Sequence, residues 1–329
     1  MMPIRKDPPS KDSSSRPEPS EARRSGETFS RRFAGFSWRE GLSTSHLRCS
    51  DRDDGLVQSL IRLLLCVTVL LGPLPAAAQT PQRVVTLNLC LDQMALRLAA
   101  PGQLVGVSYL SQDPHLSVLA DRAATLAPVR DSVESILVLR PDLVILGKDT
   151  HAPLKRLLRG ADVRLLELPW ATSIEEAEVV IDQMAKALGR EETGRHLIAD
   201  MREQRTRLTW TGAPRGTAVY LEANRGTSGK GSLMDELLRL SGYRNLAAEL
   251  GIGSFGRVSL ETVLAAEPDL LVLDGTANKN PARATEFVGH HALLALAGTA
   301  KLASVPTRYS ICAGPDNFQV MRLLAEAGR

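Results

Sequence analysis

Short apolar, β-branched runs alternate with amphipathic segments along residues 81–329 of this 329-residue chain. Apolar runs bounded by turn residues are typical of buried strands, and the segments between them have helical spacing. This alternation predicts an α/β fold with short parallel sheets covered by helices. Strands are expected at 83–87, 104–107, 143–146, 163–168 and 218–221, with helices from about Asp92 to Leu98 and over 133–139.

Two longer helices are predicted in the middle of the chain. Ser173 and Glu176 form a capping-box pattern ahead of an amphipathic helix that ends at Gly189. The next helical stretch runs from Glu191 to about Thr209 and is charged along much of its length. As a helix it would span about 30 Å, which suits a rigid connector between two α/β halves.

The second half of the chain repeats a unit of the first. Ser132 onward reads SVESILVLRPDLVIL, and Ser259 onward reads SLETVLAAEPDLLVL, without gaps. Each predicts a capped helix, a Pro-Asp turn and a parallel strand. The repeat predicts two similar Rossmann-like lobes, with ligands bound in the cleft between them, outside the carboxyl ends of the strands.

The N-terminal part differs from the rest. Residues 1–56 are rich in Ser, Pro, Arg and Glu, which predicts a disordered segment or an extension upstream of a true start near Val57. Residues 57–78 combine a basic flank, an apolar core and the small-residue stretch PAAAQT. The core is about nine residues long, too short to span a bilayer. These features predict a secretory signal cleaved after Ala78, with an uncut anchor as the alternative.

Length and charge add limits to this picture. The chain is long enough for two domains of ordinary size. Its net charge of only +3 gives no reason to expect a nucleic-acid partner. The predicted organisation is the extension 1–56, the signal peptide 57–78, an N-terminal lobe 79–190, a bridging helix 191–210 and a C-terminal lobe 211–329.

Four segments together carry a family resemblance over residues 81–329. They are RVVTLNLCLDQ at Arg83, the repeat units at Ser132 and Ser259, and TSGKGSLMDELLRLSGYRNL at Thr227. The chain resembles the periplasmic binding proteins of iron–siderophore, haem and cobalamin importers. The resemblance implies a monomer with two lobes joined by one long helix, which closes only slightly on its ligand and catalyses nothing. It also implies no cofactor beyond iron or cobalt in the ligand, and delivery from the periplasm to an ABC permease dimer in the inner membrane.

The resemblance places one permease-docking glutamate on each lobe, Glu134 and Glu261. Two acidic points, one per lobe, can pair with arginines of a two-fold permease dimer. Glutamates in the first turn of a helix are also favoured by the helix macrodipole. A purely structural role for both residues therefore stays open.

Cys90 and Cys312 are the cysteines that would remain after cleavage. By resemblance both lie at the cleft, Cys90 in the turn after the first strand and Cys312 before a final helix that starts near Asn317. Three interpretations stay open: a disulfide between the lobes, thiolate contact to a bound metal, or two unrelated buried cysteines. A secreted enzyme that uses Cys90 is a further alternative, although no motif positions a histidine beside it.

Other cleft candidates are aromatic and arginine residues in predicted loops that follow strands or precede helices, which the resemblance places at the cleft. Such side chains can stack on a macrocycle or pair with an acidic siderophore, and ordinary loop packing is the alternative. Cobalamin binders of the family line the cleft with several tryptophans, whereas Gly147 and Pro128 stand where rings would be expected here. The predicted ligand-binding residues are Asn88, Cys90, Tyr109, Trp170, Arg225, Phe255, Arg257, Tyr309 and Cys312.

Neither the glycine-rich stretch after Gly226 nor the histidines are interpreted as a binding site. The glycine-rich stretch after Gly226 lacks Walker A spacing, because Gly231 follows Lys230. No metal site is predicted, and a receptor for a free metal or an oxyanion stays an alternative, as does a sensor that reports the ligand. The His290-His291 pair is interpreted as a surface feature, and His115 and His151 lack a carboxylate at ligand spacing.

Overall fold

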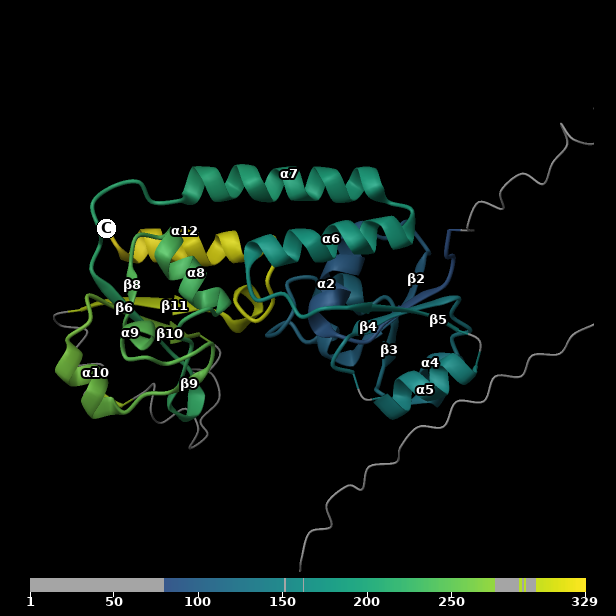
Figure 1. Cartoon of the computed structure of the whole chain (residues 1–329), viewed down its shortest axis with the longest axis horizontal. Helices are drawn as coiled ribbons and strands as arrows, with labels where there is room; N and C mark the ends of the chain where they lie inside the picture. The colour runs from purple at the N-terminus through teal and green to yellow at the C-terminus, as the bar shows by residue number, and fades with distance from the viewer. Residues whose placement is uncertain (1–79, 151, 162, 276–289, 292, 294–299) are drawn as a thin grey trace, which may run out of the picture. The chain divides into compact units, whose positions relative to one another are not determined.

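Two parallel sheets, one in each lobe, form the centre of the computed structural model, which describes residues 80–329 apart from 151, 162, 276–289, 292 and 294–299 (Figure 1). The predicted extension, the signal peptide and its cleavage point after Ala78 lie outside the described residues. The N-terminal sheet has the order β3-β2-β1-β4-β5 and the C-terminal sheet the order β11-β10-β6-β8. The predicted α/β fold is thereby confirmed.

The strands are short, and most are apolar along their whole length, as expected for strands covered on both faces. In the N-terminal lobe they are β1 (Val84–Thr86), β2 (Leu104–Ser108), β3 (Ala127–Val129), β4 (Leu143–Gly147) and β5 (Arg164–Leu168). In the C-terminal lobe they are β6 (Thr217–Leu221), β8 (Arg244–Asn245), β10 (Leu270–Asp274) and β11 (Lys301–Val305), with a separate antiparallel pair of β7 (Gly226–Thr227) and β9 (Gly256–Arg257).

Helices cover the sheets, and none of those in the described ranges is long and apolar enough to cross a membrane. Those of the N-terminal lobe are α2 (Leu89–Leu98), η1 (Tyr109–Gln112), α3 (Ala120–Ala123), α4 (Val133–Leu137), α5 (Ala152–Gly160) and α6 (Ile174–Leu188). After α7 (Glu191–Leu208) follow η2 (Ala223–Arg225), α8 (Leu233–Leu240), α9 (Leu246–Glu249), α10 (Leu260–Ala266), η5 (Thr307–Tyr309) and α12 (Asn317–Ala327).

The two repeat units fold alike, down to single contacts. Ser132 caps α4 and Ser259 caps α10, each accepting a hydrogen bond from the backbone N–H three residues ahead. Each helix is followed by a residue with positive φ, Arg140 or Glu267, directly before the Pro-Asp turn. The aspartate of each turn then accepts backbone N–H groups at the start of the neighbouring strand: Asp142 from Gln82 and Arg83, and Asp269 from Thr217.

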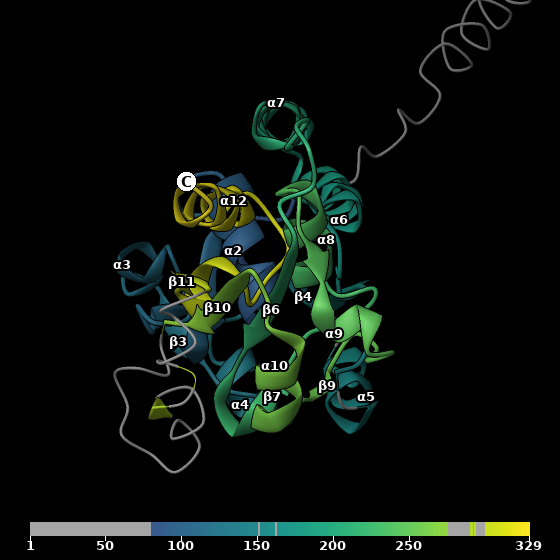
Figure 2. The same cartoon turned by 90° about the vertical axis from the view of Figure 1, so that its left-hand side faces the viewer.

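Helix α7 is the predicted bridge, and it lies along α6 and α12 (Figures 1 and 2). Gly189 ends α6 in the left-handed conformation, with φ of 66°, which lets the chain reverse into α7. Gly194 allows the two helices to approach closely, because a Cβ atom there would lie 2.5 Å from the Cβ of Ala185. Only Gly194 and Met201 of α7 are buried, so the bridge is a mostly solvated helix held along one edge.

One apolar core continues across both lobes beneath these helices. It includes Leu98 and Met184 from the N-terminal lobe, Met201 from the bridge, and Leu238 and Phe318 from the C-terminal lobe. The outer face of each sheet has a smaller core of its own. A shared core favours lobes that move little relative to one another.

The start of α2 differs from the prediction. The helix begins at Leu89, not near Asp92, because the Asn88 side chain caps it by accepting the backbone N–H groups of Cys90 and Leu91. Cys90 therefore lies in the first turn of a helix and not in a loop after β1. The Ser173–Glu176 box is also only half formed: Ser173 caps α6, while the Glu176 carboxylate accepts from Thr172.

Candidate functional site

A pocket of about 270 Å³ lies at the carboxyl ends of the strands in the N-terminal lobe. The strand order reverses between β1 and β4, because β2 and β3 lie on one side of β1 and β5 lies beyond β4. Ligands of open α/β sheets bind at such a switch point. The pocket is lined by Leu87, Asn88, Cys90, Leu91, Met94, Asp131, Gly147, Asp149, Thr150, Pro169, Trp170, Ala171, Val180 and Ala313.

Three of the predicted ligand-binding residues line this pocket: Asn88, Cys90 and Trp170. Asn88 is committed to capping α2, so its Oδ1 atom already has two donors. The Trp170 side chain follows β5 and is 55% exposed, which leaves a ring face free to contact a ligand. Ala313, beside Cys312, brings the C-terminal lobe to the same pocket.

Cys90 and Cys312 form a disulfide, with Cα atoms 5.2 Å apart. The bond joins α2 of the N-terminal lobe to the segment between η5 and α12 of the C-terminal lobe. Among the three interpretations left open by the sequence, the structure has the bond between the lobes. A disulfide sulfur is neither a metal-binding thiolate nor a nucleophile, so in this state Cys90 serves neither of those roles.

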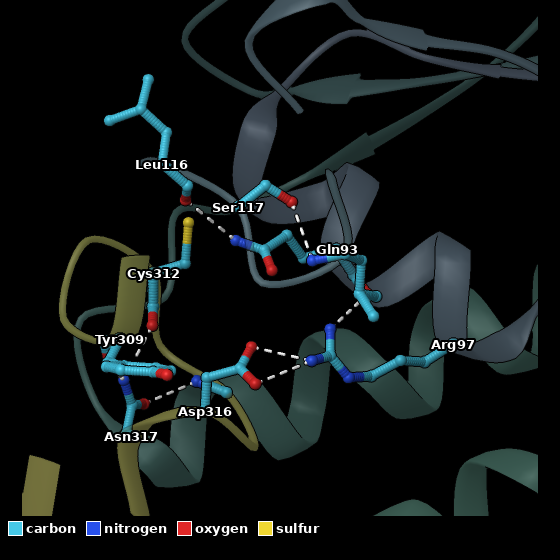
Figure 3. Close-up of polar contacts among 10 residues, drawn as sticks. Gln93, Arg97, Leu116, Ser117, Tyr309, Cys312, Asp316 and Asn317 are labelled. Carbon is cyan, nitrogen blue, oxygen red and sulfur yellow. Dashed lines mark hydrogen bonds and ion pairs between the residues drawn. The ribbon is translucent and has the colours of Figure 1, made fainter. Parts of the chain in front are cut away.

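The segment that carries Cys312 has further contacts with the N-terminal lobe (Figure 3). Asp316 accepts two hydrogen bonds of 2.8 Å from the Arg97 guanidinium of α2. Burial raises the pKa of the Asp316 carboxyl, against the opposing effect of Arg97. Arg308 donates to the backbone carbonyl of Pro114. The disulfide is therefore accompanied by an ion pair and a hydrogen bond between this part of the C-terminal lobe and the N-terminal lobe.

Asn317 shapes the same segment from the start of α12. Its side-chain amide donates to the carbonyls of Tyr309 and Cys312, and its Oδ1 atom accepts from the backbone N–H of Gly314 (Figure 3). Asn317 is fully buried. These bonds fix the path of the chain between η5 and α12 and hence the position of Cys312.

The two predicted tyrosines each lie beside an arginine. The Arg130 guanidinium lies 4.7 Å from the ring centre of Tyr109, and that of Arg308 lies 5.1 Å from the ring of Tyr309. Tyr109 belongs to η1 after β2 and is 46% exposed. Neither tyrosine lines the pocket in the N-terminal lobe, so the structure does not bring them together with Trp170 there.

The fully buried carboxyl of Asp92 accepts hydrogen bonds from residues on both sides of Tyr109. One of its oxygens, Oδ2, accepts from the backbone N–H of Ser108 and from the Ser111 hydroxyl. Burial raises the pKa of Asp92 to about 7, although the hydrogen bonds from Ser111 and Ser108 lower it. The group thus titrates near neutral pH and holds the turn that presents Tyr109.

The remaining predicted residues belong to the C-terminal lobe. Arg225 and its neighbour Asn224 both have positive φ, 62° and 56°, which costs conformational energy for residues other than glycine. Arg257 lies in the short strand β9, paired with Gly226, and not in a loop as predicted. The Phe255 side chain is 69% exposed. Arg225, Phe255 and Arg257 do not line the pocket in the N-terminal lobe.

Four carboxylates at strand ends escaped the sequence analysis. Asp131 and Asp149 follow β3 and β4 and line the pocket. Glu222 follows β6 and Asp274 ends β10, where the strand order of the second sheet reverses. Burial, and then the nearby Asp274 charge, raise the pKa of Glu222. Position near the end of a predicted strand was the one signal for Asp149, Glu222 and Asp274, and no strand was predicted before Asp131.

The described residues hold no cluster of three or more His, Cys, Asp or Glu side chains suited to a metal ion. His290 and His291 stack on each other, with ring centres 4.5 Å apart. His151 lies outside the described residues. The two predicted docking glutamates, Glu134 and Glu261, are exposed in the first turns of α4 and α10.

Sequence comparison relates the chain to proteins of one kind. It is 26% identical over 218 residues to a cobalamin-binding protein of Halobacterium salinarum, covering 63% of this chain and 58% of the relative. The chain thus spans less than two thirds of that relative's length. It is 25% identical over 228 residues to a vitamin B12-binding protein of Pectobacterium carotovorum, covering 67% of this chain and 78% of the relative.

Solved structures share the fold. The periplasmic heme-binding protein HutB of Vibrio cholerae matches with a TM-score of 0.63 and 19% identity, over 74% of this chain and 98% of that one. The heme-binding protein RhuT from Roseiflexus sp. RS-1 matches with a TM-score of 0.60 and 24% identity, over 75% and 99%. The family model of periplasmic binding proteins matches residues 84–301. This chain therefore belongs to the periplasmic binding protein family.

Proposed function

We propose that the protein is the exported substrate-binding component of an ABC importer and that it captures a metal chelate, an iron–siderophore or a cobalamin- or haem-type macrocycle. The observation that carries the proposal is the pocket at the switch point of the N-terminal lobe. It is completed by Ala313 of the C-terminal lobe and bordered by an exposed tryptophan. Curated relatives of the chain are named as cobalamin- and vitamin B12-binding proteins, which supports the macrocycle.

The contacts between the lobes support a receptor that stays nearly preformed. The shared core, the disulfide and the Arg97–Asp316 ion pair all tie the lobes together. Preformed sites lose little free energy to ordering when a ligand binds. In this proposal the lobes capture the chelate with small closure and without chemical change.

Tryptophan fluorescence tests the ligand proposal. The purified chain is titrated with cyanocobalamin, haemin and a ferric siderophore, and at least one is expected to quench emission with Kd below about 10 μM, or about −7 kcal/mol. Trp170→Phe should remove most of the quenching. Trp210→Phe is the matched control, because Trp210 is also partly exposed but stacks on Arg215 away from the pocket. Failure of every chelate to bind below that limit contradicts the proposal.

The permease partner is a separate part of the proposal. Glu134 and Glu261 occupy the same place in the two repeat units, one on each lobe, and both are exposed. Charge reversal at both, Glu134→Lys/Glu261→Lys, should abolish uptake in cells while leaving ligand affinity unchanged. Glu191→Lys, in the first turn of α7, is the control and should transport normally. Normal uptake by the double variant would exclude this docking mode.

A further inference from the structure

The pocket wall offers a ligand two kinds of surface. One part is apolar, formed by Leu91, Met94 and Val180, and Trp170 adds an exposed ring. The other part is polar and comes from the loops at the carboxyl ends of the strands, with Asp131 after β3 and Asp149 after β4. A flat ligand with an apolar face and a polar edge fits this division.

The polar part of the wall consists mainly of unoccupied acceptors. Among the described residues, neither Asp131 nor Asp149 accepts a hydrogen bond or forms an ion pair. Asn88, by contrast, already has its oxygen bonded to two backbone N–H groups. The two carboxylates are therefore charged groups on this wall that a ligand can engage at no cost in protein contacts. The side-chain amide N–H groups of Asn88 and the Thr150 hydroxyl are neutral polar groups of the same wall.

Three basic side chains near this end of the lobe have partners away from the pocket. Arg130, directly before Asp131, lies over the Tyr109 ring. Lys155 and Arg159 both pair with Glu167. No lysine or arginine occurs among the described residues that line the pocket. Lys148, directly before Asp149, is exposed but is not one of the lining residues, so the described lining carries two carboxylates and no cation.

We propose that Asp131 and Asp149 are specificity-determining residues that select a ligand edge carrying N–H donors, such as primary amides or an ammonium group, and reject a carboxylate edge. This inference rests on the proposed chelate-binding function. A donor edge gains charge-assisted hydrogen bonds to the carboxylates. A carboxylate edge would enter the pocket against two like charges and lose hydration with no cation among the described lining residues to compensate it.

Two macrocycles of opposite edge chemistry test the inference. Dicyanocobinamide carries primary amides around its ring, and haemin carries two carboxylates. Competition titrations with the purified chain should show the amide-bearing macrocycle binding at least about 100-fold more tightly, which corresponds to about 2.8 kcal/mol. The double variant Asp131→Asn/Asp149→Asn should lose about tenfold in affinity for dicyanocobinamide and gain about tenfold for haemin.

Charge reversal and a distant control sharpen the test. Asp149→Lys should favour haemin over dicyanocobinamide, reversing the order seen in the unmodified chain. Asp200→Asn, on the exposed side of α7, should leave both affinities unchanged. Equal or tighter binding of haemin by the unmodified chain, unaffected by either aspartate, overturns the specificity proposal while leaving the proposed function intact. Absence of binding to either macrocycle and to ferric siderophores overturns both.

Discussion

Helix α2 of the N-terminal lobe and helix α8 of the C-terminal lobe each have a buried aspartate in the first turn, in different surroundings. Helix α2 carries the buried Asp92 in its first turn, and helix α8 carries the buried Asp235. Asp235 accepts from Gly231 and Asn245 and pairs with Arg239. Asp92 accepts from Ser108 and Ser111 but has no cation, and its Oδ1 lacks a hydrogen-bond partner in the described structure.

This difference shows that a buried aspartate in the first turn of a helix can have different electrostatic surroundings in the two lobes. In the C-terminal lobe the aspartate is neutralised by a neighbour on its own helix and acts as a structural anchor. In the N-terminal lobe the aspartate lies beneath the turn that carries Tyr109 and keeps a pKa near neutral. The C-terminal lobe therefore has an ion-paired aspartate in this turn, while the N-terminal lobe has a buried titratable group next to Ser108 and Ser111.

The largest expected effect concerns the pH dependence of stability. Because the pKa of folded Asp92 is raised from 3.8 to about 7, the folded chain keeps a proton that the unfolded chain releases. The free energy of unfolding should therefore fall as pH rises from about 4 to about 7, by about 4 kcal/mol in total. Urea unfolding at several pH values should show this fall in the unmodified chain and a much smaller one in Asp92→Asn.

Asp235→Asn is the matched control for that series. It should lower stability because Asp235 accepts from Gly231 and Asn245 and pairs with Arg239. Glu222 and Asp316 also have raised pKa values and act in the same direction, so Asp92→Asn should retain part of the slope. If the free energy of unfolding of Asp92→Asn fell with pH as steeply as that of the unmodified chain, Asp92 would not be the source of the pH dependence.

Removing the link between the lobes should have the next largest effect. The double variant Cys90→Ala/Cys312→Ala loses a disulfide that closes a loop of 222 residues, and its free energy of unfolding should fall by about 2–4 kcal/mol. Thermal unfolding followed by circular dichroism measures the change. A dithiol reductant added to the unmodified chain should reproduce it, and an unaffected midpoint would mean that the bond does not couple the lobes.

The repeat units offer a matched pair of core positions. Ile136 of α4 and Val263 of α10 hold the same place in the two units, and both are fully buried. Ile136→Ala should cost about 3 kcal/mol and Val263→Ala about 2 kcal/mol, because the first removes one more carbon. Urea unfolding gives both values. A cost under 1 kcal/mol at either site would show that its lobe repacks around the cavity.

The smallest effects are expected at the caps. Ser132→Ala and Ser259→Ala should each lower the free energy of unfolding by about 1 kcal/mol, since each hydroxyl accepts one backbone N–H at a helix start. Similar losses in both variants would support equivalent roles in the two lobes. If only one variant lost stability, the other lobe would tolerate a helix whose first turn lacks its serine cap.

The predicted strands agree with the structure to within one or two residues, because apolar runs such as Leu143–Gly147 pack between covering helices and leave little freedom of register. The start of α2 was placed too late. The apolar pattern predicts a cleft turn over residues 89–91, whereas the Asn88 side chain caps a helix that begins there. Asp131 and Asp149 were missed because an exposed aspartate after a strand has no periodicity to mark it.

The sequence by itself determined the local elements, the repeat and the resemblance to binding proteins, because apolar spacing, serine caps and Pro-Asp turns act between residues close in the chain. Only the tertiary structure decided that Cys90 meets Cys312 and that Asp131 and Asp149 face one pocket. It alone placed Asp92 in a fully buried position. Those outcomes depend on how distant strands align and how the lobes pack together, and no short-range pattern encodes either.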